Sequence, residues 1–191
     1  DLLRLEHVNK GAVTVHATAT KGILGEMAGD IGDACYTRQF QIMAQERITA
    51  VLFTVGNGEQ TRFVGSMLLL ENRCQGRPVL ILRAINPRED FISEYCPQDF
   101  LAGAIEFSRR VGERKGGVML VAPWFKQGVK GALTNRVGVI DQAIKNFYAS
   151  KTPVVLDAPE DFNGYNITRK CLKLLTARPG LAVDNFDGGA L

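Results

Sequence analysis

The feature that most constrains this chain is a strand–helix–strand pattern that spans Val79–Ala122. Its first part, Val79–Ile85, is an apolar run broken only by Arg83, and it is too short for a stable helix. The Asn86–Pro87 step that follows disfavours helix at the residue before the proline. A continuous apolar run of this kind is typical of a strand that is covered on both faces. The last part, Val118–Ala122, is a second short apolar run and predicts a second buried strand.

The segment between these runs predicts an amphipathic helix over Gln98–Lys115. Pro97 suits the first turn of a helix, and Gly116 suits its end. A helix between two buried strands usually forms a parallel crossover, so we expect a mixed sheet with helices on its faces. The apolar residues recur at three- and four-residue spacing and form one stripe: Phe100, Leu101, Ala104, Ile105, Phe107, Ser108 and Val111.

Composition narrows the class of protein. The chain has 191 residues, of which 46% are hydrophobic and 23% charged, so one globular domain with a real core is expected. We predict a single α/β domain over residues 1–177 and a C-terminal tail over residues 178–191. A net charge of +3 gives no strong nucleic-acid signal, and no apolar run approaches the ~18–20 residues that span a bilayer.

The four cysteines are widely scattered and contain no CxxC pair, so we expect no metal site; whether they form disulfides is left open. The chain begins with Asp1, and its opening shows no signal-peptide pattern. We therefore expect a cytoplasmic location, and a chain that can be one domain of a longer protein.

The rest of the first half predicts three more strands, a loop and a helix. The Asn57–Gly58 pair is a strong hairpin signal, so the two strands on either side of it are expected to pair antiparallel. In order, the segments are a half-buried strand at Ala12–Ala17, a glycine-bearing loop at Lys21–Asp33, a helix at Ala34–Gln45 that Asp33 could cap, and strands at Ile48–Val55 and Arg62–Leu70.

The second half continues with less regular patterns. One segment, Ile167–Leu175, suits either a helix or a last strand. Before it come a loop at Pro123–Leu133, a helix at Asn135–Tyr148, a short strand at Thr152–Leu156 and a turn-rich loop at Asp157–Tyr165.

This order of elements, with the Asn-Gly hairpin that leads into VLILRAI, resembles the GNAT superfamily of acyl-CoA-dependent N-acyltransferases. The resemblance covers roughly Val13–Leu175 and depends on architecture more than on a motif. It implies a GNAT-like sheet, acetyl-CoA or another acyl-CoA as donor, and a small-molecule or peptide amine as acceptor. In the family, the central strand parts from its neighbour and its backbone pairs with the pantetheine arm, while the next helix N-terminus faces the pyrophosphate.

Carried over by position, the resemblance implies a set of site residues. The pantetheine-facing strand would be Leu82, Arg83, Ala84 and Ile85, and the pyrophosphate would lie near Arg88 and Gln98. Asn135 would line the same site, and Tyr148 would protonate the leaving thiolate. No general base is identified.

The sequence departs from the family where a glycine-rich loop should join strand to helix. That connection has no glycine before Gly103, and four acids oppose the single cation Arg88: Glu89, Asp90, Glu94 and Asp99. This favours an alternative, in which the chain is a degenerate GNAT-like recognition or scaffold domain that does not bind CoA. Its protein partner would contact the loop Trp124–Gly131.

A third interpretation places a nucleophile at Cys35. This residue follows Asp33 at the expected start of a helix, where a thiol pKa is lowered, and His16 could act as its base. The chain would then be a Cys35-dependent hydrolase or transferase. A small core residue is the alternative for Cys35. A structural ion pair with Glu71, Glu89 or Asp90 is the alternative for Arg83.

Overall fold

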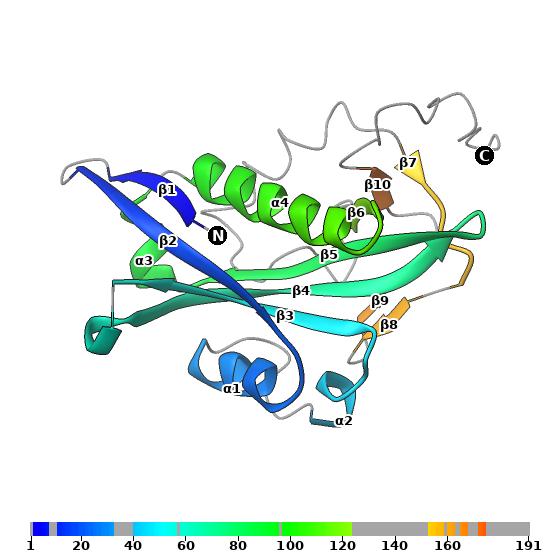
Figure 1. Cartoon of the computed structure of the whole chain (residues 1–191), viewed down its shortest axis with the longest axis horizontal. Coiled ribbons are helices and arrows are strands. Elements are labelled where there is room, and N and C mark those ends of the chain that lie inside the picture. The colour runs from blue at the N-terminus through cyan, green and yellow to red at the C-terminus, as the bar shows by residue number, and fades with distance from the viewer. Residues whose placement is uncertain are drawn as a thin grey trace.

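In the computed structural model of the chain, a long twisted sheet carries helices on both faces (Figure 1). The structure describes residues 2–7, 11–32, 40–56, 58–95, 97–123, 153–158, 160–162, 165–167 and 172–174. The helices are α1 (Ile23–Ile31), α2 (Phe40–Met43), α3 (Glu89–Ile92) and α4 (Pro97–Arg114), with a short 3-10 turn η1 (Gly58–Gln60).

The strands of the described residues form one large sheet and one separate hairpin. The large sheet has the order β1-β2-β3-β4-β5-β6-β10-β7, and the hairpin pairs β8 with β9. The strands are β1 (Leu2–His7), β2 (Gly11–Thr20), β3 (Ile48–Val55), β4 (Arg62–Cys74), β5 (Arg77–Pro87), β6 (Met119–Pro123), β7 (Pro153–Val154), β8 (Glu160–Phe162), β9 (Tyr165–Ile167) and β10 (Leu172–Leu174).

The predicted fold class is confirmed: the fold is α/β with a mixed, mostly antiparallel sheet flanked by helices. In the described part of the large sheet, every pairing is antiparallel except that of β5 with β6, which is parallel and is joined by α4. The parallel crossover expected from the Val79–Ala122 pattern is therefore present. In the described part of the chain, no helix is both long and apolar enough to cross a membrane.

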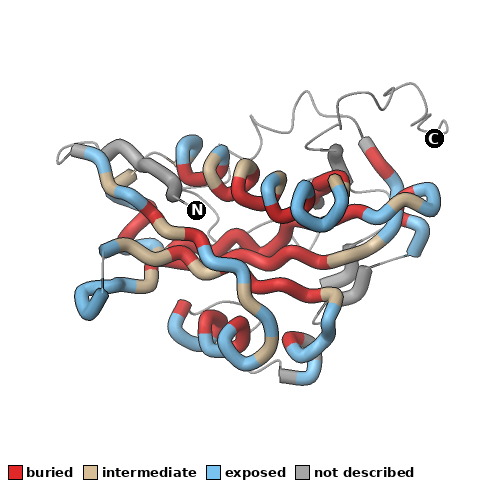
Figure 2. Tube along the Cα trace, in the orientation of Figure 1, coloured by how far each residue is buried: buried red, intermediate tan, exposed pale blue. Residues whose placement is uncertain are grey.

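The two faces of the sheet bury separate cores. α4 covers one face, where Phe100, Ala104 and Val111 pack with residues such as Leu82 of β5. α1 and α2 cover the other face, where Met43, Ala50 and neighbouring residues form a second cluster. Figure 2 shows the buried residues running along the central strands and along the sheet-facing sides of α1 and α4.

The predicted loop at Lys21–Asp33 is wrong, because α1 occupies Ile23–Ile31. Its glycines indicated turns, but Gly25 serves close packing. A Cβ on Gly25 would lie 2.8 Å from the Ala50 Cβ and 2.9 Å from the Met43 Cε, so only glycine lets the helix approach β3 this closely. Packing against the sheet therefore overrides the low helix propensity of glycine.

Four other segments differ from expectation, and one segment that was left open is resolved. The helix predicted at Ala34–Gln45 ends at Met43, and residues 33–39 lie outside the described part. The connection after Pro87 holds a short helix, α3, because Phe91 and Ile92 are apolar and fully buried. The turn-rich loop at Asp157–Tyr165 contains the strand β8 and the start of β9, and the ambiguous segment near the C-terminus is a strand at β10. The strand β1 was not predicted.

Candidate functional site

The central strand β5 is interrupted by a β-bulge at Ala84. Ala84 has a φ of 50°, which is the left-handed region that residues other than glycine rarely adopt. On the neighbouring strand, Leu68 pairs with Arg83 and Ser66 pairs with Asn86, so β5 has one residue more than β4 across this interval. Bulges of this kind re-aim side chains and occur often beside active sites.

The bulge lies where β5 parts from β6. The parallel pairing covers only Val79–Ile81 with Met119–Val121, although β5 continues to Pro87. On its opposite edge β6 pairs with β10, through Ala122 with Lys173 and Pro123 with Leu172. Within the described residues, the register between β5 and β6 ends at Ile81 and Val121, and β5 continues beyond it to Pro87. Leu82–Ile85, whose backbone the resemblance predicts to face a pantetheine arm, lies just beyond this last register pair, and its four residues are buried.

On the edge of β5 that faces away from β6, the backbone of β4 lies very close to the end of β5. A Cβ added to Gly65 would lie 2.6 Å from the Pro87 Cα and 2.7 Å from the Asn86 carbonyl oxygen. Gly65 also has a φ of 156°, and the β3–β4 register shifts beside it, between Phe53 and Thr54. The β3–β4 and β4–β5 pairings thus both shift register near Gly65 and Ser66, so the backbone at this end of the sheet departs from that of a regular strand.

Arg83 does not present its charge to solvent. It is 3% exposed, and its register partner Leu68 belongs to the core cluster on the α1 side of the sheet. Two of the acids suggested as its partners are bound elsewhere: Glu71 pairs with Lys115 and Asp90 pairs with Arg88. Arg83 has an interaction partner, but a contact with a bound ligand would require the neighbouring side chains to move.

The connection between β5 and α4 is acidic, and its one cation is engaged. The Arg88 Nε lies 3.1 Å from the Asp90 Oδ1, and both side chains are about half exposed. This hydrogen bond lowers the pKa of Asp90 below its usual value. Gln98 lies in the first turn of α4, next to Asp99. Arg88 and Gln98 both follow the end of β5, where Asp90 binds Arg88 and is also influenced by the charge of Arg62.

Several predicted residues lie outside the described part of the chain: Cys35, Asn135, Tyr148 and the loop Trp124–Gly131. Their roles stay predictions. His16 is half-buried on β2, opposite Thr54 of β3, and its relation to Cys35 is equally untested. Among the described residues, no group of acids, histidines and cysteines could hold a metal ion.

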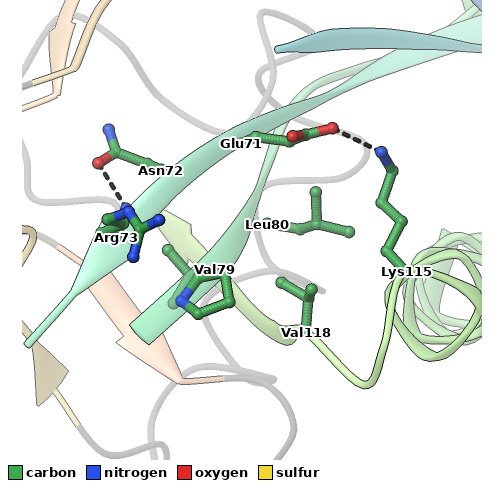
Figure 3. A pocket seen from close by; sticks show the side chains of 8 residues that line it. Glu71, Asn72, Arg73, Val79, Leu80, Lys115 and Val118 are labelled. Carbon is green, nitrogen blue, oxygen red and sulfur yellow. Dashed lines mark hydrogen bonds and ion pairs between the residues drawn. The ribbon is translucent and has the colours of Figure 1, made fainter. Parts of the chain in front are cut away.

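A hollow of about 490 Å³ that the sequence did not indicate lies near the start of β5 (Figure 3). Leu80 and Val118 give it apolar walls, and Glu71 and Lys115 meet across it through an Nζ–Oε1 contact of 2.5 Å. Glu71 and Lys115 bind each other, and Arg73, the third charged residue of the lining, donates to the Gly76 carbonyl oxygen, so each charged group of the hollow is engaged. It also lies toward the opposite end of β5 from Ala84.

No protein-family model matches the chain, and no significant match is found among curated proteins. The geometry of β5 is therefore the feature from which a function is inferred.

Proposed function

We propose that this chain is an acyl-CoA-dependent N-acyltransferase that transfers an acyl group directly to an amine. The observation that carries the proposal is the bulged second half of β5, which leaves β6 just before the chain enters α4. An extended ligand such as a pantetheine arm carries amide groups that can pair with a strand edge, as an added strand would. The backbone of Leu82–Ile85 supplies this edge.

In this proposal the strand holds the thioester and the helix end holds the phosphates. The first-turn N–H groups of α4 beyond Pro97 favour an anion. The amine nitrogen attacks the thioester carbonyl carbon, the C–N bond forms, and the C–S bond breaks. The leaving thiolate takes a proton, for which Tyr148 is the proposed donor, and Asn135 is proposed to line the site.

One observation favours a second function. Arg88 is the only basic residue of the β5–α4 connection, and Asp90 already binds it, while Glu89, Glu94 and Asp99 add negative charge. Such a connection repels phosphate. The second proposal is therefore a recognition domain with this fold that does not bind CoA and that contacts a protein partner through Trp124–Gly131.

Binding of acetyl-CoA separates the two proposals. A ligand that binds only the folded chain stabilises it by about 2.7 kcal/mol at a hundred times its dissociation constant, so the thermal midpoint should rise with millimolar acetyl-CoA. Adenosine 3′,5′-bisphosphate, a nucleotide that lacks the pantetheine arm, is the control for phosphate binding alone. A midpoint that acetyl-CoA leaves unchanged would reject the acyltransferase and support the recognition domain.

A matched pair of variants at one position locates the binding. Glycine accepts the positive φ of Ala84, whereas valine disfavours it by roughly 1–2 kcal/mol. We expect Ala84→Gly to keep the acetyl-CoA-induced rise and Ala84→Val to lose most of it. Equal rises in both variants would place the ligand away from the bulge.

A further inference from the structure

The described part of the chain buries six polar or charged side chains, and three of them, Ser66, Arg83 and Asn86, surround the β5 bulge. Ser66 is the register partner of Asn86, and Leu68, two residues along β4, is the partner of Arg83. The three are between 0% and 3% exposed. Buried polar side chains thus border the bulge, and the surrounding structure must supply them with interaction partners, because an uncompensated buried polar group is costly.

The bulge itself puts Arg83 and Asn86 on one face of the sheet. In a regular strand, residues three apart face opposite sides. Here Leu82 and Ile85, also three apart, both belong to the core under α4. Their neighbours Arg83 and Asn86 consequently both face the other side, where α1 packs.

A fourth buried polar residue, Glu26, comes from α1. Its neighbour Gly25 sits directly on Ala50, and Ala50 pairs with Leu68, the register partner of Arg83. Glu26 is 1% exposed, and it is the one buried carboxylate among the described residues, as Arg83 is the one buried cation. Each of the four residues has an interaction partner, but within the described part of the chain neither Glu26 carboxylate oxygen accepts a hydrogen bond and the Asn86 Nδ2 donates none. Charges buried this completely are costly unless opposite charges and hydrogen bonds compensate them.

We propose that α1 fixes the shape of the β5 bulge through this buried polar cluster, defined as Glu26, Ser66, Arg83 and Asn86, with Glu26 as the positioning residue. The inference rests on the proposed function, because the bulge is the part of β5 that would hold the acyl thioester. Glu26 is too deeply buried to touch the substrate as the structure stands. It would act by keeping the backbone at Ala84 in its left-handed conformation.

The expected effect follows from the population of the bulged strand. A left-handed alanine costs roughly 1–2 kcal/mol, so β5 can relax toward a regular strand once the polar cluster is weakened. The apparent affinity for a ligand falls in proportion to the fraction of molecules in the binding-competent shape. If about one molecule in ten keeps the bulge, the dissociation constant rises about tenfold.

The test compares Glu26→Gln, which removes the charge at nearly constant volume, with Ile48→Val. Ile48 is fully buried on the same face, at the far end of β3, and its truncation destabilises the core without touching the bulge. The full chain is used, with acetyl-CoA binding measured by titration calorimetry and the thermal midpoint measured without ligand. We expect about tenfold weaker binding in Glu26→Gln and binding within twofold of the unmodified chain in Ile48→Val.

A second readout needs no CoA. The Cα and Cβ chemical shifts of Ala84 report its backbone conformation, and Glu26→Gln should move them toward strand values while Ile48→Val leaves them unchanged. If the unmodified chain does not bind acetyl-CoA, the proposed function fails, and these shifts alone decide whether α1 controls the bulge.

Two outcomes overturn the inference. One is a Glu26→Gln variant whose thermal midpoint falls while its acetyl-CoA affinity stays within twofold; the other is an unchanged Ala84 shift. If Glu26→Gln does not fold, Ser66→Ala, a smaller change in the same polar cluster, is judged by the same two criteria.

Discussion

Replacing Gly65 by alanine tests the close contact between β4 and the end of β5. The new methyl carbon would lie 2.6 Å from the Pro87 Cα and 2.7 Å from the Asn86 carbonyl oxygen, and both are backbone atoms that cannot rotate away. The φ of 156° adds strain, because L side chains rarely adopt it. Strained backbone costs roughly 1–3 kcal/mol and overpacking roughly 1–3 kcal/mol, so we expect a loss of about 2–6 kcal/mol.

Urea unfolding measures this loss. Since a protein of this kind is stable by about 5–15 kcal/mol, the midpoint concentration should fall markedly while the slope stays constant. Gly76→Ala is the matched control: its φ is 71°, but a Cβ there meets nothing within 4 Å, so it reports strain of roughly 1–2 kcal/mol without a clash. If Gly65→Ala costs no more than Gly76→Ala, the described contact between β4 and β5 is wrong.

Three further predictions concern charge and burial. Asp157 accepts hydrogen bonds from the backbone N–H groups of Gln75 and Gly76, at 2.6 and 2.8 Å. Asp157→Ala should therefore lower the free energy of unfolding by about 1–2 kcal/mol, as measured by urea titration. An unchanged urea midpoint would show that these two hydrogen bonds do not stabilise the fold. Hydrogen bonds from Arg109 and Arg110 of α4 lower the pKa of Glu106 to about 2. The ionised Glu106 therefore stabilises the fold fully when the pH is above the pKa of the unfolded chain, near 4.5, and this stabilisation is lost as the pH falls toward 2. Because these groups are exposed, Glu106→Gln should cost only about 0.5 kcal/mol at pH 7 and nothing near pH 2, as measured by thermal midpoints; a constant difference across pH would contradict the ion pairs. Burial, and secondarily the charge of Asp157, raises the pKa of Cys74 to about 11, so iodoacetamide at pH 8 should label it only after unfolding; rapid labelling in the native chain would show that the thiol is accessible.

The sequence predicted the parts of the fold that carry a strong local signal. The helix α4 has an apolar stripe, a proline at its start and Gly116 after its end, so its predicted span differs from the observed one by one residue at each end. The hairpin of β3 and β4 was predictable from Asn57–Gly58. By contrast, α1 was missed because Gly25 packs against Ala50, a residue far away in sequence, and no local pattern reveals this contact.

The bulge at Ala84 was not predicted, because alanine gives no signal for a left-handed conformation. Arg83 and Asn86 offered an indirect signal. They are polar residues three apart in an apolar strand, and a regular strand would have put them on opposite faces, in two separate cores. Their placement on one face requires an extra residue between them, and the structure supplies it. The four-residue helix α3 was missed for a different reason, since Phe91 and Ile92 are two apolar residues in an acidic segment.

The central claim is that acyl-CoA binds along the half of β5 that has parted from β6. Amide hydrogen exchange with and without millimolar acetyl-CoA tests it most directly, because a bound pantetheine arm would pair with backbone groups of Leu82–Ile85. We predict slower exchange in peptides that cover these residues and the start of α4, with no change across Ile48–Val55 of β3. Exchange that acetyl-CoA leaves unchanged along β5, or slows only elsewhere, would contradict the claim.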